Sequence, residues 1–133
     1  QNLYLVSGYR SYADQAYSFS NAIERRGLTG AAEKNAYQGR SEHNLGLALD
    51  INIASDPEIR DAFAETTAGR WVNENGHLYG FILRYPRDKG HITGYGYEAW
   101  HYRYVGPELA TTLFETGQTL EEYYGKEQEL PDA

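Results

Sequence analysis

The sequence predicts an α+β domain with a small, mainly antiparallel sheet flanked by helices. Segments in which apolar residues alternate with polar ones, as in strands, come in mixed order with segments of helical spacing. The links between them are short and hairpin-like, which favours antiparallel pairing. The chain has 133 residues, 41% of them hydrophobic, and no visible repeat or linker. We therefore expect one domain over residues 1–133, with a polar, acidic end at about 126–133 that is frayed.

The first predicted elements are a strand and a helix. Leu3–Val6 is a short apolar run that ends at a Ser-Gly turn, which is typical of a strand. Ser11 then begins a helix with a capping-box pattern, and Gly27, after two arginines, is the predicted end of that helix. Small and polar residues without a clear period dominate 28–39, which predicts a loop with no more than one helical turn at 31–36.

A strand near the middle of the chain carries an acidic residue. Leu47, Leu49, Ile51 and Ile53 alternate with smaller or polar residues, so these four side chains share one face of the strand. Asp50 is expected to point to the other face. An unpaired buried carboxylate is costly, and Asp50 therefore needs a cation or strong hydrogen-bond donors nearby.

The second half of the chain alternates between helices and strands. The patterns first predict a helix from Asp56-Pro57 to about Thr66 with Ile59, Ala62 and Phe63 buried, and then a helix through Trp71, Val72 and Leu78 that closes at Gly80. Three strands are predicted next: Phe81–Tyr85, an irregular one over Ile92–Tyr97, and Trp100–Val105. A helix that starts at Gly106-Pro107 and a last short helix with Leu120 and Tyr123 complete the chain.

Charge and composition exclude several classes of function. Acidic residues outnumber basic ones by 19 to 12, and the basic residues form no runs of the kind that bind a phosphate backbone, so we do not expect nucleic acid as a partner. No apolar stretch approaches the ~20 residues that span a bilayer, so no membrane contact is expected from this segment. The sequence has no cysteine, and any metal site must therefore be built from histidine and carboxylate.

Two short segments concentrate residues that a packed core would not select. His43, Asp50 and His101 are three nitrogen and oxygen ligands of the kind that a catalytic zinc site takes, with a fourth position left to water. Gly46 allows the chain to bend so that His43 and Asp50 reach the same ion. Glu98 stands close enough before His101 to accept a proton from water at the metal. The arrangement predicts metal-assisted amide hydrolysis.

The same residue types also have simpler interpretations. A salt bridge from Asp50 to Arg10 or Arg103 would satisfy the carboxylate without a metal, and spacing alone leaves both interpretations open. For His77 and His91 we adopt an ordinary core or surface role, and both are left out of the predicted site.

Longer strings of the sequence resemble a known family. Ser7–Tyr12, Ser41–Asp50, Gly80–Pro86 and Glu98–Gly106 are similar, in this order, to the motifs of the VanY-type D-alanyl-D-alanine carboxypeptidases and their LdcB-like L,D-carboxypeptidase relatives. These belong to a group of zinc peptidases that includes the VanX dipeptidases and the hedgehog domain. The resemblance implies an α+β fold of the hedgehog/D-Ala-D-Ala-peptidase type.

The resemblance also implies roles for individual residues. The family's metal ligands correspond to His43, Asp50 and His101, which would bind one zinc ion per chain, and its catalytic base corresponds to Glu98. Arg10 is implied to contact the polarised carbonyl or a substrate carboxylate. Four more residues match substrate-contacting or cleft-wall positions, for which packing or capping is an equally consistent role: Gln15, Ser41, Tyr85 and Trp100.

The activity that the resemblance implies is the release of the terminal D-alanine from peptidoglycan stem peptides. Gln38-Gly39-Arg40 and Ala99 depart from the usual family pattern at the rim of the cleft, which leaves D,D or L,D specificity open. A D,D-dipeptidase, a cell-wall endopeptidase and a non-catalytic zinc-stabilised wall-binding module stay open as well. We expect a monomer in the bacterial cell envelope outside the cytoplasm, with a signal or anchor upstream of this segment.

Overall fold

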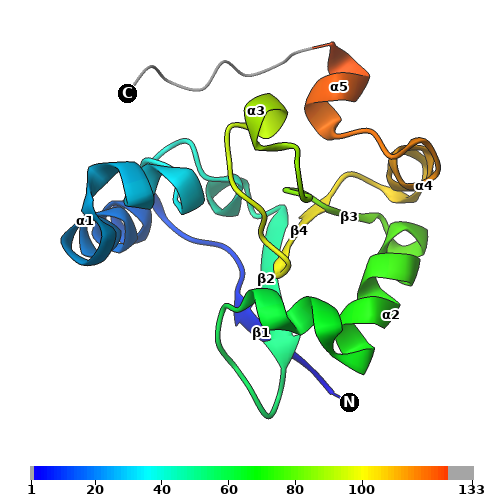
Figure 1. Ribbon diagram of the computed structural model, residues 1–133, viewed down its shortest axis with the longest axis horizontal. Coiled ribbons are helices and arrows are strands. Elements are labelled where there is room, and N and C mark those ends of the chain that lie inside the picture. Colours follow the sequence, from blue (N-terminus) through cyan, green and yellow to red (C-terminus); the bar gives the residue numbers. More distant parts are fainter. Residues whose placement is uncertain (1, 126–133) are drawn as a thin grey trace.

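The protein folds as a small sheet with helices on both sides (Figure 1). The computed structural model describes residues 2–125. In chain order the elements are β1 (Leu3–Ser7), α1 (Tyr12–Lys34), the 3-10 helix η1 (Glu42–Leu45), β2 (Ala48–Ile53), the 3-10 helix η2 (Asp61–Glu65), α2 (Thr67–Asn75), the 3-10 helix η3 (Gly76–Tyr79), β3 (Phe81–Leu83), α3 (Gly90–Thr93), β4 (His101–Tyr104), α4 (Pro107–Thr116) and α5 (Leu120–Tyr124).

The sheet has four strands in the order β1-β2-β4-β3, and each neighbouring pair is antiparallel. Strand β4 lies between β2 and β3, although β3 precedes it in the chain. In Figure 1 the helix α1 lies to one side of the strands, and α2 and α4 lie to the other. This architecture confirms the predicted α+β class and the antiparallel sheet.

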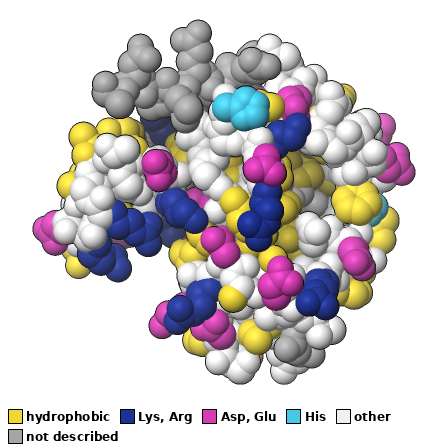
Figure 2. All heavy atoms as spheres, viewed as in Figure 1, with side chains coloured by type: hydrophobic (Ala, Val, Ile, Leu, Met, Phe, Trp, Pro, Cys, Tyr) yellow, Lys and Arg dark blue, Asp and Glu magenta, His cyan; other side chains and the backbone are white. Residues whose placement is uncertain are grey.

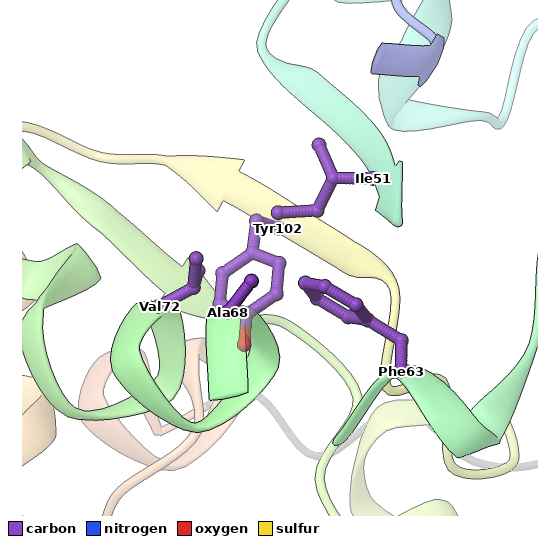
Figure 3. Packing of buried hydrophobic residues seen from close by; sticks show 5 residues of the cluster. All are labelled: Ile51, Phe63, Ala68, Val72 and Tyr102. Atoms are coloured by element: carbon purple, nitrogen blue, oxygen red, sulfur yellow. The ribbon is translucent and has the colours of Figure 1, made fainter. Parts of the chain in front are cut away.

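One face of the sheet carries the main apolar cluster. Ile51 from β2 and Tyr102 from β4 pack against Phe63 from η2 and against Ala68 and Val72 from α2, as Figure 3 shows. The partly buried aliphatic residues of β2, which the sequence placed on the same face, pack against this cluster. Because side chains alternate along a strand, the residues between them point to the opposite face.

The helix α1 continues beyond its predicted end. Gly27 breaks the helical geometry with φ 71° and ψ 172°, as its pattern indicated, but the chain resumes a helix at once and continues to Lys34. The prediction of a loop from residue 28 was therefore wrong over this part. The second stretch is held by packing, because Ala31 is fully buried in a cluster with Phe19 and Ala22.

The helix predicted from Asp56-Pro57 begins later and is shorter. Asp56 donates its backbone N–H to the carbonyl of Ile53 in a tight turn, and its side chain accepts from Arg60 rather than capping a helix. Only the 3-10 helix η2 forms, with Phe63 buried as predicted. Ile59, expected in the buried stripe, is 44% exposed.

The irregular strand predicted over Ile92–Tyr97 is absent. Residues 90–93 form the short helix α3, which ends at Gly94, and the segment that follows is a loop. Thr93 accounts for part of this, because its hydroxyl donates to the carbonyl of Tyr95 and accepts from the N–H of the same residue. The local side-chain bonds replace the ladder of a strand.

The predictions for the C-terminal part are confirmed. A helix starts at Pro107, and Thr119 begins the short helix α5 with a capping box that involves Glu122. The predicted frayed end at 126–133 lies outside the described residues. Within residues 2–125, none of the helices combines the length and apolar character that crossing a bilayer requires.

Candidate metal centre

Two of the predicted ligands face each other across the sheet. Asp50 in β2 is the direct cross-strand partner of His101 in β4, and direct partners point to the same face. This is the face opposite to that of Ile51 and Tyr102. The two polar residues are 3% and 5% exposed, so the fold buries a carboxylate and an imidazole side by side.

His43 reaches this face from the 3-10 helix η1. Ser41 begins that helix by accepting the N–H of His43 at 3.2 Å, and Gly46 ends it in the left-handed region with φ 71°. The left-handed conformation of Gly46 lets the chain bend before β2, as predicted from the sequence. The backbone carbonyl of His43 accepts the N–H of Arg10 at 3.0 Å, which ties η1 to the segment after β1.

The three predicted ligands converge on one point. Asp50 Oδ1 lies 3.1 Å from His43 Nε2 and 3.1 Å from His101 Nδ1, and ligand atoms of all three residues lie within 4.8 Å of one another. The other ring nitrogens have partners too, because His43 Nδ1 is 2.7 Å from the Gly8 carbonyl oxygen and His101 Nε2 is 3.2 Å from Glu42 Oε1. Two buried imidazoles with fixed orientations and one carboxylate fit a zinc-like divalent ion.

The salt-bridge interpretation of Asp50 accounts for only part of its surroundings. Arg10 Nη2 is 3.8 Å from Asp50 Oδ2, which is longer than a hydrogen bond, and Arg103 pairs with Glu42 at 2.6 Å instead. Burial by itself would raise the pKa of Asp50, but hydrogen bonds from the two imidazoles lower it to about 2. The carboxylate is therefore held in its ionised, ligating form.

Glu98 lies beside the three ligands without joining them. Its Oε2 is 3.7 Å from His101 Nδ1, and its backbone carbonyl accepts the His101 N–H at 3.4 Å, so the chain turns just before β4. Burial raises the pKa of Glu98 to about 8, and the charge of Asp50 adds to this shift while His101 opposes it. Burial would lower the pKa of His101, but hydrogen bonds to Asp50 and Glu42 raise it to about 9.

A cleft of about 880 Å³ opens beside this centre, and Asp50, Glu98 and His101 line it. Figure 2 shows the surface hollowed between α1 and the body of the molecule, with Lys and Arg side chains at the border of the hollow. All five residues predicted for substrate contact lie in the lining: Arg10, Gln15, Ser41, Tyr85 and Trp100. The structure therefore gathers the predicted site around one opening.

Arg10 is fixed in this cleft by two neighbours. Its guanidinium donates to Gln15 Oε1 at 2.8 Å and to Ser7 Oγ at 2.7 Å. Gln15, only 2% exposed, donates in turn to the Ala36 carbonyl at 2.7 Å. Gln15 thus contributes to the site by holding Arg10 as well as by lining the cleft.

Aromatic rings form part of the cleft wall. The Tyr85 ring lies 5.0 Å from the His101 ring and 4.9 Å from the Tyr95 ring, measured between centroids. Trp100 is buried, and Lys34 Nζ lies 5.1 Å from the centre of its ring. These contacts restrict the orientation of His101 and shape the space beside it.

Glu42 and Arg84 were not among the residues predicted for the site from the sequence. Glu42 accepts hydrogen bonds from Arg84 Nε at 2.8 Å and from Arg103 Nη1 at 2.6 Å, in addition to its contact with His101. Burial would raise the pKa of Glu42, but these three partners lower it to about 2. The available signal was the position of an acidic residue directly before His43.

The two remaining histidines have other surroundings. Among residues 2–125, the predicted ligand set is the one group of three or more His, Asp or Glu side chains arranged to hold a metal ion. His77 stacks on Phe114 with ring centroids 4.0 Å apart, and its Nδ1 lies 3.0 Å from Thr111 Oγ1. His91 is exposed in α3.

A three-ligand centre with a buried glutamate beside it, at the edge of an open cleft, is the arrangement of a mononuclear metallohydrolase. The family model of VanY, D-alanyl-D-alanine carboxypeptidase, matches residues 1–107. The chain belongs to this family.

Similar curated proteins carry carboxypeptidase names. The chain is 48% identical to YodJ of Bacillus subtilis (strain 168), which has the name of a carboxypeptidase, over 91% of this chain and 45% of YodJ. It is 42% identical to a D-alanyl-D-alanine carboxypeptidase of Enterococcus faecalis, over 92% of this chain and 47% of that protein. The chain thus spans about half the length of these relatives.

Solved structures with the same fold include proteins with a bound ligand or metal. The LdcB LD-carboxypeptidase superposes with a TM-score of 0.84 at 46% identity, over 96% of this chain and 60% of that chain. VanYB in complex with D-alanine-D-alanine gives 0.82 at 38% identity, over 96% and 72%. A glutamate-to-alanine mutant of the D,D-pentapeptidase VanY in complex with Zn(II) gives 0.81 at 37% identity, over 92% and 71%.

Proposed function

We propose that this chain is the catalytic domain of a zinc-dependent carboxypeptidase that releases the terminal D-alanine from peptidoglycan stem peptides. The observation that carries the proposal is the convergence of His43, Asp50 and His101 on one point, with Glu98 next to them. Membership of the VanY family supports the reaction class. The Zn(II) complex of a similar VanY protein supports the choice of metal.

The metal would be held by His43 Nε2, Asp50 and His101 Nδ1, the atoms that face one another. A zinc ion in such a site polarises a carbonyl oxygen and lowers the pKa of a coordinated water towards ~7. The carbonyl of Gly8 fixes the ring of His43, and Glu42 fixes the ring of His101. The chain thereby sets the orientation of both imidazoles before any metal binds.

Glu98 is the proposed general base. Its carboxyl group stands beside the ligating nitrogen of His101, where it can take a proton from a water at the centre and pass it to the leaving amine. Burial raises the pKa of Glu98 to about 8. A bound cation favours the carboxylate form and so counters the effect of burial.

Arg10 is proposed to bind the oxygen that gains negative charge during hydrolysis, or the terminal carboxylate of the substrate. Its guanidinium lines the cleft and is pre-oriented by Gln15 and Ser7. A group held in this way costs little reorganisation when charge develops in the transition state. Ser41, Tyr85 and Trp100 are proposed to form the walls that position the peptide.

The substrate assignment agrees with what similar proteins bind. VanYB was solved with D-alanine-D-alanine, and the LdcB structure concerns peptidoglycan recognition. We propose that residues 1–133 act as one catalytic domain and as a monomer, in the bacterial envelope outside the cytoplasm where stem peptides lie.

The test is product analysis with the zinc-loaded protein. Muropeptides of defined length, with tetrapeptide or pentapeptide stems, are incubated with the wild type, with Glu98→Gln and with Glu115→Gln, and the products are identified by mass spectrometry. Glu115 is an exposed glutamate on α4 and serves as the matched control. We expect Glu98→Gln to keep about one zinc per chain and to lose about 100-fold or more of D-alanine release, whereas Glu115→Gln stays at the wild-type rate.

The products also separate the alternatives. Release of D-alanine from the tetrapeptide stem indicates L,D specificity, and release from the pentapeptide stem indicates D,D specificity. Accumulation of the dipeptide D-alanyl-D-alanine, or cleavage inside the stem, would replace the proposed activity with that of a dipeptidase or an endopeptidase. Zinc binding without any turnover would leave a wall-binding module, and wild-type release by Glu98→Gln would refute the assignment of the base.

A further inference from the structure

A buried chain of charged side chains leads from the metal centre to the C-terminal helix. Glu42 Oε1 lies 3.2 Å from His101 Nε2, and Glu42 Oε2 accepts from Arg84 Nε at 2.8 Å. Arg84 turns its other two nitrogens to Glu121 on α5, with Nη1 donating to Oε2 at 2.9 Å and Nη2 donating to Oε1 at 2.5 Å. The side chains of Glu42, Arg84 and Glu121 are 11%, 10% and 6% exposed.

We propose that Glu42 is a positioning residue of the metal centre, and that Arg84 and Glu121 connect the helix α5 to that centre through it. The inference rests on the assignment of His101 as a metal ligand under the proposed function. Glu42, Arg84 and Glu121 thus form a second group of residues, which would affect the metal only through His101.

Glu42 determines which nitrogen of His101 is available to a metal. A neutral imidazole carries its proton on one nitrogen and a lone pair on the other. In the metal-free protein a carboxylate accepts at each ring nitrogen of His101, Asp50 at Nδ1 and Glu42 at Nε2. When a cation replaces the proton on Nδ1, Glu42 still accepts the proton on Nε2, so Nδ1 is the nitrogen that faces Asp50 and is left for the metal. The ring nitrogen of His43 that faces away from Asp50 has a neutral carbonyl as its partner. Of the two histidines, His101 is therefore the one whose outer ring nitrogen faces a charged group.

Glu42 can do this only if its own carboxylate is fixed. Arg84 and Arg103 both donate to Oε2, which leaves Oε1 for the imidazole. In residues 2–125 no fully buried side-chain nitrogen or oxygen lacks a hydrogen-bond partner, so the network is satisfied. A satisfied network of buried charges is rigid, whereas removal of one member leaves a neighbouring charge unpaired.

The helix α5 takes part through Glu121. A helix of five residues is not stable by itself, and its bidentate pair with Arg84 is a buried contact that fixes it to the body of the protein. Glu121 in turn fixes the guanidinium of Arg84 so that the Arg84 Nε points to Glu42. This helix lies beyond residues 1–107, which the family model matches.

The experiment measures zinc affinity, by competition with a chromophoric chelator, and the absorption spectrum of the cobalt-substituted protein. The variants are Glu42→Ala, Glu42→Gln, Glu121→Gln and Glu122→Gln. Glu122 is the matched control, because it lies on the same helical turn, caps α5 at Thr119 and pairs with Lys89, yet does not contact Arg84 in the described structure. Circular dichroism and the unfolding temperature of each metal-free variant report on the fold.

We expect Glu42→Ala to weaken zinc binding about 10- to 100-fold and to shift the cobalt spectrum, as loss of the partner of a ligating histidine does. Glu42→Gln keeps an oxygen that can accept from His101 and should therefore bind zinc more tightly than Glu42→Ala. Glu121→Gln should weaken binding by about three- to tenfold, and Glu122→Gln should change only the stability of α5.

Several results would overturn the inference. Zinc affinity within about twofold of the wild type in both Glu42 variants would remove its first part. Equal effects of Glu121→Gln and Glu122→Gln would remove the link to α5. Neither readout depends on catalysis, so a wild type that binds zinc but releases no D-alanine would refute the proposed function and leave this inference standing.

Discussion

Removal of zinc should lower the unfolding temperature of the protein by an amount that depends on the three predicted ligands. A ligand that binds only the folded state at 100 times its Kd stabilises that state by ~2.7 kcal/mol. For a chain of 133 residues, ~2.1 cal/mol/K per residue gives an unfolding entropy of ~280 cal/mol/K. The expected shift is therefore about 10 °C between the chelated and the zinc-saturated protein.

The assay is calorimetry or circular dichroism on the wild type, Asp50→Asn, His43→Ala and His77→Ala, each with chelator and with excess zinc. Asp50→Asn keeps the size of the side chain and its oxygen near both imidazoles, so it preserves the packing while removing the charge that a cation needs. His77 is the matched histidine, since it stacks on Phe114 away from the centre. We expect the rise in unfolding temperature on zinc addition to be much smaller in Asp50→Asn and His43→Ala than in the wild type, and to persist in His77→Ala.

Two results would contradict the assignment of the metal ligands. A zinc shift of wild-type size in both Asp50→Asn and His43→Ala would show that the ion binds elsewhere. Loss of the shift in His77→Ala would place His77 in the metal site, against the geometry of the described residues.

Three further predictions concern the metal-free centre, Arg10 and two glycines. In the metal-free protein the pKa values of His101 and Glu98 are raised to about 9 and about 8, so both groups favour the folded state at low pH. The unfolding temperature in chelator should therefore fall as the pH rises from about 4.5 to 9, with the Glu98 contribution lost by about pH 8 and the His101 contribution by about pH 9. Arg10→Lys should lower kcat/KM for D-alanine release by about 100-fold, because one ammonium cannot replace the oriented guanidinium, and an unchanged value would exclude Arg10 from the reaction. Gly69→Ala should lower the free energy of unfolding, measured by denaturant titration, by about 3 kcal/mol, since the added Cβ would overlap a backbone carbonyl. Gly94 has open space around it and a φ of +81°, so Gly94→Ala should lower the free energy of unfolding by only about 1–2 kcal/mol.

The parts of the fold that the sequence predicted correctly depend on local rules. Alternation along residues 47–53 separated the aliphatic face of β2 from the face of Asp50, and Gly46 marked the bend that brings His43 to the same place. The cap at Ser11 marked the start of α1. In each case a few neighbouring residues determine the conformation, so the pattern is visible without tertiary contacts.

The parts that the sequence did not reveal depend on contacts with distant residues. The helical stretch after Gly27 has weak periodicity, and it is held by the burial of Ala31 against Phe19. The segment at 57–60 is kept out of a helix partly by Asn52, whose side chain donates to the Glu58 carbonyl at 2.6 Å. Propensity gives no information about such partners, and tertiary packing overrides it.

The candidate site shows the same division. The proposed ligands and the proposed base, Glu98, could be selected from the sequence because short motifs around them carry the resemblance to the family. The role of Glu42 could not, because it depends on Arg84, which reaches it from after β3, and on Glu121 from α5. The family motif includes Glu42, but only the three-dimensional structure identifies the partners of Glu42.

The two faces of the central strands separate stability from chemistry. In β2 and β4, Ile51 and Tyr102 belong to the apolar cluster on one face, while Asp50 and His101 lie on the other. Because alternation links these neighbours along the backbone, a shift of register by one residue would exchange the two sets and bury the ligands in the apolar cluster. The free energy of packing on one face thus opposes any slip that would move the ligands on the other.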